Sequence, residues 1–267
     1  MTDVRARIGY SERTGKRPYF YANAHEKDYV PLAPELVTIR DARGRGCSLD
    51  VEGFTLVAHE TAVPDLSDLE QVKQLYTGEA AALIQSVTGC DHVTMAPMGI
   101  LRFSERQGAH AAHDNSHPAR FVHVDVSREA AVEMRASGAP EGRTIVRSAQ
   151  YNVWRVLSDP PQDVPLGLCD YTSVAPTDLI DCDAIFDPLD GSEEWSFPNY
   201  LLAANPAHRW FYYPDMHRGE ALIFKTSESD PKLAQCMPHG AFDNPLADPD
   251  TAPRISLEIR GTAFWFG

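Results

Sequence analysis

The stretch Arg120-Phe121-Val122-His123-Val124-Asp125 decides the fold expected for this chain. Its apolar and β-branched residues predict a buried β-strand. Residues two apart on a strand project from the same face, so His123 and Asp125 can bind one metal ion together. The stretch therefore predicts a metal site carried by a sheet.

Two motifs further along the chain extend this site. His239 lies in the run Pro238-His239-Gly240-Ala241-Phe242, and Arg254-Ile255-Ser256 follows near the C-terminus. Two imidazoles and one carboxylate on one side of a metal are the facial ligand set of non-haem Fe(II) oxygenases. A guanidinium fork matches a carboxylate, so we expect Arg254 and Ser256 to hold 2-oxoglutarate. The pattern predicts an enzyme that uses Fe(II), 2-oxoglutarate and O2.

Other histidines compete for the metal. His208 is the rival to His239, but it precedes Arg209-Trp210, where a structural histidine is more natural, and it lies far before Arg254. We therefore favour His239. Three more histidines occupy a stretch rich in alanine, for which a lid or substrate channel is a better interpretation than a second metal site; they are His110, His113 and His117.

The composition limits the class of protein. With 267 residues and 43% hydrophobic side chains, the chain can bury the core of one domain, residues 1–267. It has no apolar run long enough to span a bilayer and no signal peptide, so we expect a soluble, cytoplasmic protein without membrane partners.

Charge and cysteine usage agree with this expectation. The net charge of -14 repels polyanions, so nucleic acid is not an expected partner. The five cysteines are odd in number and widely spread, which favours reduced, packed thiols over a disulfide framework.

Periodicity predicts a mainly β fold with flanking helices. Helical spacing covers residues 69–89, capped by Ser67 or Asp68, and a second helix is expected over 127–136 from its N-cap, Ser127. Residues 1–50 suggest an N-terminal arm or lid, and 107–118 a loop. The predicted strands are 53–59, 92–103, 144–146, 150–157, 210–213, 221–225, Phe242 and 254–260. Short strands separated by Pro, Asp and Gly favour a double-stranded β-helix, or jelly roll.

Five ordered motifs carry a resemblance to a known family. They span about residues 50–260 and consist of 152–155, 165–170, 208–213 with Met216, 220–225, and 254–260. In these runs the chain resembles the hydroxylase/desaturase family of natural-product pathways, which includes a gibberellin desaturase, a cephalosporin hydroxylase component and a fungal endoperoxide-forming oxygenase. The resemblance implies Fe(II), O2 and 2-oxoglutarate acting on a small metabolite, by hydroxylation or desaturation.

Further pocket residues follow from the central strand. Asn152, Trp154 and Arg155 are expected to line the pocket, Asn152 and Arg155 near the cofactor, and Lys225 is a further candidate for an anion contact. Arg260 is expected either to bind a second anion or to form an exposed salt bridge. The four tryptophans are expected to pack in the core.

The chain departs from the family pattern at two places. Gly240 replaces a more usual threonine, and residues 187–195 form an acidic loop that looks like an insertion. We expect these departures to concern the identity of the substrate more than the binding of the metal.

Two alternatives to this function stay open at the level of sequence. One is a cupin-like iron enzyme that does not use 2-oxoglutarate, and the other is a jelly-roll binding protein without turnover. The aromatic end, residues 264–266, is expected to dock on the core or on a second subunit, which leaves a homo-oligomer open.

Overall fold

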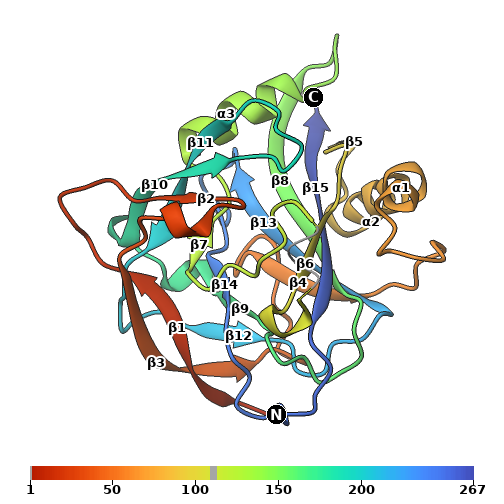
Figure 1. Ribbon diagram of the computed structural model, residues 1–267. Coiled ribbons are helices and arrows are strands. Elements are labelled where there is room, and N and C mark those ends of the chain that lie inside the picture. Colours follow the sequence, from red (N-terminus) through yellow and green to blue (C-terminus); the bar gives the residue numbers. More distant parts are fainter. Residues whose placement is uncertain (1, 109–112) are drawn as a thin grey trace.

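Two β-sheets face each other in the computed structural model of the chain (Figure 1). The structure describes residues 2–108 and 113–267. Among these residues, the larger sheet has nine strands in the order β1-β3-β12-β9-β14-β7-β11-β10-β2. The smaller has six, in the order β4-β13-β8-β15-β5, with β6 also paired to β15. This arrangement is the predicted jelly roll.

The strands differ greatly in length. Those of the larger sheet are β1 (Val4–Ser11), β2 (Tyr19–Tyr21), β3 (Leu32–Asp41), β7 (His123–Val124), β9 (Leu166–Cys169), β10 (Leu179–Phe186), β11 (Trp195–Leu202), β12 (Trp210–Tyr212) and β14 (His239–Ala241). Those of the smaller sheet are β4 (Phe54–Ala58), β5 (His92–Met95), β6 (Ile100–Phe103), β8 (Ile145–Val156), β13 (Glu220–Glu228) and β15 (Ile255–Phe266).

The helical segments begin and end as the sequence signals indicate. Asp68 accepts hydrogen bonds from the first turn, and Gly89, with φ of 67°, closes the last one. Between them the helix is interrupted by a π turn. The segments are α1 (Leu69–Gln71), the π-helix η2 (Val72–Tyr76), α2 (Thr77–Thr88) and α3 (Arg128–Ser137), with short 3-10 turns at His25–Lys27, Glu105–Gln107, Tyr171–Ser173 and Pro176–Asp178.

Strand alternation divides the smaller sheet into two faces. Trp154 on β8 and Phe224 on β13 point between the sheets, where they pack with Leu168 of the larger sheet. The neighbouring residues Tyr151 and Val153 point the other way and pack against α2 in a second core. Side chains of even number on β8 therefore face the interior of the jelly roll, and those of odd number face α2.

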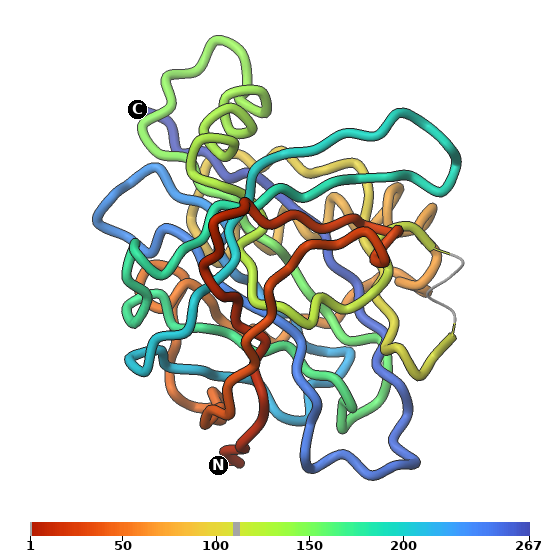
Figure 2. Tube along the Cα trace, turned by 60° about the vertical axis from the view of Figure 1, so that its left-hand side comes forward, coloured from red at the N-terminus to blue at the C-terminus, as the bar shows by residue number. Residues whose placement is uncertain are grey.

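The N-terminal region, residues 1–50, was expected to form an arm or lid. It contributes the strands β1, β2 and β3 to the larger sheet. β1 and β3 form an antiparallel pair at one edge, and β2 pairs in parallel with β10 at the other. Figure 2 shows this red segment running alongside the hairpin formed by β10 and β11. Phe20 of β2 packs on Phe121, with ring centroids 4.8 Å apart, so the region also reaches the predicted metal strand.

Several elements differ from the sequence-based predictions. The pieces 144–146 and 150–157 belong to one strand, β8, whereas 92–103 splits into β5 and β6. Strands β1, β2, β3, β9, β10 and β11 were not predicted, and β14 ends just before Phe242, where a strand was expected. The acidic loop 187–195 lies mostly in the connection between β10 and β11, and the aromatic end 264–266 forms the last part of β15.

The state of the cysteines and the character of the helices can be compared with the expectations from composition. Each of the five cysteines is free, as the prediction of reduced thiols requires, and all except Cys47 are buried. Within residues 2–108 and 113–267, none of the helices has the length and apolar character needed to cross a membrane.

Candidate metal centre

His123 and His239 lie directly opposite each other on neighbouring antiparallel strands. The register of β7 and β14 pairs the two residues, and their ring centroids are 4.4 Å apart. Side chains at opposed positions of an antiparallel pair lie on the same face of the sheet. The pairing therefore brings together two imidazoles from distant parts of the sequence.

Asp125 completes the group just beyond the end of β7. Its Oδ1 is 3.6 Å from His123 Nε2, and one ligand atom from each of Asp125, His123 and His239 lies within 4.8 Å of the others. All three residues are buried. Two nitrogens and one carboxylate oxygen at this spacing match the donor set that Fe(II) takes in facial sites.

The backbone orients both imidazoles. His123 Nδ1 lies 3.3 Å from the carbonyl oxygen of Phe121, and His239 Nδ1 lies 3.1 Å from that of Met237. Because a carbonyl only accepts, each Nδ1 must donate its hydrogen, which leaves the lone pair on Nε2 for a metal. Burial, with the neighbouring His123, lowers the pKa of His239 to about 4, so this imidazole is neutral near neutral pH.

Two side chains from the smaller sheet hold the Asp125 carboxylate. Asn152 Nδ2 donates to Asp125 Oδ2 at 2.7 Å, and Arg260 Nη2 donates to Oδ1 at 3.1 Å. Burial alone would raise the pKa of Asp125, but the Arg260 charge and the histidines outweigh it and keep that pKa well below its ordinary value. Asp125 is therefore ionised and fixed in place, as a metal ligand must be.

Arg260 resolves one of the sequence-based alternatives. Besides Asp125, its guanidinium binds Glu258 Oε1 at 2.7 Å, and its side chain is 30% exposed. The salt-bridge interpretation is therefore correct, although the bridge lies at the candidate metal site and not on the outer surface.

Arg254 and Ser256 present unpaired polar atoms in a buried position. Arg254 is 1% exposed and Ser256 0% exposed. Among the described residues, Arg254 Nε and Ser256 Oγ have no hydrogen-bond partner. A buried donor left unpaired is costly, so these atoms indicate a missing polar partner. A carboxylate of 2-oxoglutarate fits both the charge and the donors present.

The remaining contacts of Arg254 hold its guanidinium in place. Nη1 donates to the carbonyl oxygen of Val164 at 2.6 Å, and the group lies over the ring of Trp154 at 5.7 Å. Burial, together with the nearby positive charges of Arg102 and Arg120, lowers the pKa of Arg254 to about 10. The guanidinium still carries its charge near neutral pH, and an anion beside it would offset this destabilisation.

Arg155 is not part of this site, which corrects its assignment to the cofactor. It lies on the α2 face of β8, where Nε donates to Tyr76 Oη at 2.5 Å and Nη1 donates to the carbonyl oxygens of His59 and Arg218. Asn152 and Arg155 are three residues apart on one strand, so they point to opposite faces.

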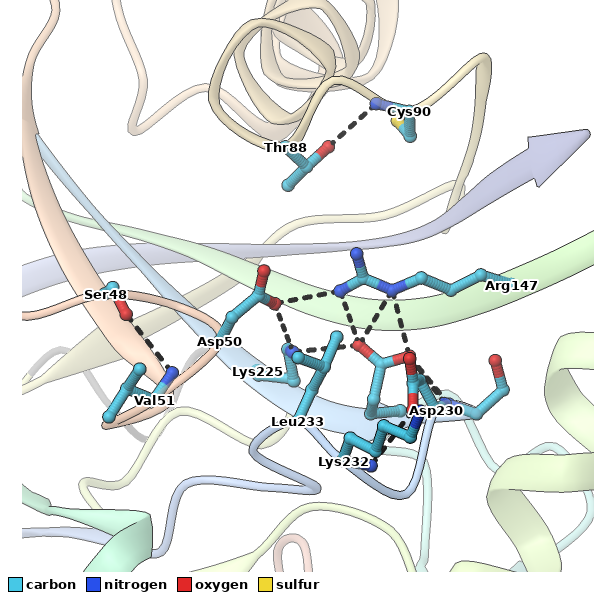
Figure 3. A network of polar contacts seen from close by, with 12 residues as sticks. Ser48, Asp50, Val51, Thr88, Cys90, Arg147, Lys225, Asp230, Lys232 and Leu233 are labelled. Atoms are coloured by element: carbon cyan, nitrogen blue, oxygen red, sulfur yellow. Dashed lines mark hydrogen bonds and ion pairs between the residues drawn. The ribbon is translucent and has the colours of Figure 1, made fainter.

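Lys225 also lies on the α2 side of the smaller sheet. The side chain is fully buried, and its Nζ donates to Asp50 Oδ1 at 3.0 Å and to Glu228 Oε2 at 2.8 Å. Arg147 binds the same two carboxylates, as Figure 3 shows for Asp50. Lys225 is therefore held in a structural ion network by two carboxylates of the protein itself, away from the candidate metal site.

The competing histidines have other partners. His208 Nε2 lies 3.1 Å from Asp178 Oδ2 and Nδ1 lies 3.1 Å from Tyr10 Oη, so both ring nitrogens are engaged. His113 stacks on Phe103 and His117 packs edge-on against His25. His110 lies outside the described residues. The structure therefore groups His239, and not His208, with His123 and Asp125.

Aromatic side chains that the sequence did not single out surround the imidazoles. Phe20 and Phe121 lie beside His123, with ring centroids 6.5 and 5.6 Å away, and Phe224 lies 4.7 Å from His239. These rings form an apolar wall that limits water around the polar group.

Comparison with known proteins gives the class to which this chain belongs. A family described as an oxidoreductase/YMDC permease-like domain matches residues 8–264. Hydroxylase/desaturase CTB9 of Cercospora beticola is 31% identical over 86% of this chain and 76% of that protein. The Fe(II)/2-oxoglutarate-dependent dioxygenase nvfI of Aspergillus novofumigatus is 29% identical over 86% of this chain and 84% of the relative.

A solved structure supports the same fold. The iron and alpha-ketoglutarate-dependent endoperoxidase NvfI superimposes with a TM-score of 0.84 at 24% identity, covering 100% of this chain and 99% of the other. That likeness confirms the jelly roll. The chain belongs to the family of Fe(II)/2-oxoglutarate-dependent dioxygenases that includes hydroxylase/desaturases, as its motifs predicted.

Proposed function

We propose that this protein is a non-haem Fe(II)- and 2-oxoglutarate-dependent oxygenase that hydroxylates or desaturates a small natural-product metabolite. The observation that carries the proposal is the convergence of His123, Asp125 and His239 within 4.8 Å. The Nε2 atoms of the two histidines and the carboxylate of Asp125 would hold Fe(II), a donor set typical of metals that activate O2 together with 2-oxoglutarate.

The co-substrate is assigned to the polar pair beside the metal. Arg254 Nε and Ser256 Oγ are buried without a partner in the part of the chain that the structure describes, and they would bind the distal carboxylate of 2-oxoglutarate. When bound, the metal and the keto acid would supply the chemistry that reduces O2 and oxidises a substrate C–H bond, with 2-oxoglutarate converted to succinate and CO2.

The protein's own contribution is orientation and exclusion of water. Asn152 and Arg260 fix the carboxylate of Asp125, and the backbone carbonyls of Phe121 and Met237 fix the two imidazoles. The phenylalanine wall beside the imidazoles offers apolar surface to a substrate. Positioning of the substrate against the metal then decides between hydroxylation and desaturation.

The two alternatives left open by the sequence are less well supported. A cupin-like enzyme without 2-oxoglutarate would leave the buried Arg254 Nε, which has no partner among the described residues, without a ligand. A binding protein without turnover would not require an ionised Asp125 carboxylate grouped with two imidazoles. Membership in the dioxygenase family favours turnover with 2-oxoglutarate.

Three further assignments belong to this proposal. One oxygenase domain, residues 1–267, is supported by a family match over residues 8–264. A cytoplasmic location is supported by five free cysteines. The third assignment is assembly into a homo-oligomer, which a measurement of molecular mass in solution tests.

The test is succinate formation from 2-oxoglutarate by purified protein supplied with Fe(II), O2 and a panel of small metabolites. We expect succinate to depend on Fe(II), and one metabolite to gain an oxygen atom or to lose two hydrogen atoms. His123→Ala should abolish both changes, whereas His92→Ala, an exposed histidine on β5, should retain them. Succinate formation that persists after removal of Fe(II), or equally in His123→Ala, contradicts the proposal.

A further inference from the structure

Arg102 lies on the interior face of the smaller sheet beside the proposed 2-oxoglutarate site. It belongs to β6, and the register of β6 with β15 places it directly opposite Ser256. Opposed residues of an antiparallel pair share a face, so Arg102 and Ser256 point to the same side. The sequence analysis did not single out this arginine.

The guanidinium of Arg102 is only partly used within the protein. Its Nη1 donates to the carbonyl oxygens of Asn115 and His117, at 3.0 and 2.7 Å, and to Asn115 Oδ1 at 3.2 Å. Among the described residues, no carboxylate lies within ion-pair distance of it, and Nε and Nη2 make no hydrogen bond. By contrast, Arg260 pairs with both Asp125 and Glu258.

Arg102 interacts electrostatically with residues of the candidate metal site and with Arg254. Burial lowers the pKa of Arg102, while the charges of Glu258 and Asp125 act to raise it. Its own positive charge helps to lower the pKa of Arg254. Arg102 is thus within electrostatic reach of the metal carboxylate and of the arginine assigned to the distal end of 2-oxoglutarate.

The charged groups around Arg102 and Arg254 favour an acidic ligand. Among the described residues, neither Arg102 nor Arg254 has a carboxylate within ion-pair distance, whereas Arg260 binds both Asp125 and Glu258. Arg102 Nε and Nη2, which have no hydrogen-bond partner within residues 2–108 and 113–267, lie in the planar geometry that binds a carboxylate at two points.

We infer that Arg102 is a second carboxylate-binding residue of this site, acting with Arg254 and Ser256. The inference rests on the proposed function. The carboxylate belongs either to 2-oxoglutarate itself or to the metabolite substrate, and the shared chemistry is a charge-assisted pair with the Nε and Nη2 donors of Arg102.

The experiment is anaerobic titration of the Fe(II)-loaded protein, followed by the visible band of the bound keto acid and by calorimetry. The first probe is 2-oxoglutarate. The second is benzoate, added to protein already saturated with Fe(II) and 2-oxoglutarate, because it joins a carboxylate to a ring that suits the phenylalanine wall. The variants are Arg102→Gln, Arg102→Lys and Arg254→Gln. Arg7→Gln is the control, since Arg7 is exposed on β1 and also donates to a backbone carbonyl.

A charged hydrogen-bonded pair accounts for a loss of about 10- to 100-fold in affinity when one partner is removed. We expect this loss in Arg102→Gln, a smaller loss in Arg102→Lys, which keeps the charge, and none in Arg7→Gln. Weaker binding of 2-oxoglutarate assigns the carboxylate to the co-substrate, and weaker binding of benzoate alone assigns it to the substrate.

Unchanged affinity of Arg102→Gln for both probes, with weak binding of 2-oxoglutarate by Arg254→Gln, would overturn the role of Arg102 and leave the proposed function intact. Wild-type protein that binds neither probe would contradict both. Circular dichroism checks that Arg102→Gln stays folded after losing its bonds to the carbonyl oxygens of Asn115 and His117. If it does not, the affinity of Arg102→Lys for the two probes provides the test.

Discussion

The amide of Asn152 donates to Asp125 Oδ2 at 2.7 Å and so joins the two sheets at the candidate metal carboxylate. Asn152 belongs to β8 of the smaller sheet, whereas Asp125 follows β7 of the larger one. With Arg260 on the other oxygen, both carboxylate oxygens have a donor from the opposite sheet. The metal site and the packing of the two sheets therefore depend on the same contact.

Replacement of Asn152 tests this contact. Asn152→Ala removes the donor and frees Asp125 to turn, so we expect Fe(II) affinity to fall by about 10- to 100-fold, as for other groups that orient metal ligands. Competition with a chelating dye measures the affinity. Gln150→Ala, two residues earlier on the same face of β8, is the control, and equal affinity of the two variants would contradict the role of Asn152.

Gly240 provides a second test, because β14 lies very close there to the residues that lead into β7. A Cβ at Gly240 would lie 3.1 Å from the carbonyl oxygen of Phe121 and 3.4 Å from the Cα of Val122. Gly240→Thr, which restores the more usual family residue, should therefore separate the strands that carry His123 and His239. We expect a loss of about 1–3 kcal/mol in the free energy of unfolding, measured by urea denaturation.

Weaker Fe(II) binding should accompany this loss of stability in Gly240→Thr. Gly15→Ala serves as the control, since a Cβ there meets nothing within 4 Å. A threonine variant as stable as wild type would show that the two strands can move apart without cost.

The buried ion network of Glu228, Lys225 and Arg147 predicts sensitivity to acid. Burial would raise the pKa of Glu228, but the bonds from Arg147 and Lys225 outweigh it and lower that pKa below 4.5. A group with a lowered folded-state pKa stabilises the protein above its unfolded-state pKa and loses this effect as the pH falls through the folded-state value. Unfolding of wild-type protein should therefore become easier below about pH 4.5.

Glu228→Gln should lose about 3 kcal/mol of stability at neutral pH, because it leaves Lys225 buried with fewer partners. The difference in the free energy of unfolding between Glu228→Gln and wild type should become smaller as the pH is lowered. Thermal melts at a series of pH values measure both effects. Glu193→Gln, at an exposed position of the β10–β11 connection, is the control, and a constant difference at every pH would contradict the assignment.

A variant of His208 tests whether this histidine has a structural role or binds the metal. Its two nitrogens contact Asp178 and Tyr10, so His208→Gln should lower the free energy of unfolding by about 1–3 kcal/mol through the loss of these buried bonds. Fe(II) content should stay at the wild-type level. Loss of iron from folded His208→Gln protein would revive His208 as the distal ligand.

Local sequence patterns predicted those parts of the molecule that depend on neighbouring residues. The spacing of His123 and Asp125, the caps at Asp68 and Ser127, and the strand ending in Arg260 are short-range signals, and the structure has the corresponding elements. Strand β11 was missed because it contains Pro198, which cannot donate to a ladder and so argues against a strand.

The errors at the site have a different physical origin. Alternation on β8 already places Asn152 and Arg155 on opposite faces, so this rule alone excludes Arg155 once Asn152 is assigned to the interior. Arg102 and Lys225 could not be assigned in this way, because their partners lie on strands or loops far along the chain. The pairing of β6 with β15, and the contact of Lys225 with Asp50, are set by the tertiary fold.

The most direct test of the metal centre is the Fe(II) content of protein reconstituted without oxygen and then desalted. We expect about one ion per chain in wild type and in His92→Ala, and almost none in His123→Ala, Asp125→Ala or His239→Ala, since the three side chains act as one ligand set. A folded His239→Ala variant that keeps a full complement of iron would contradict the account.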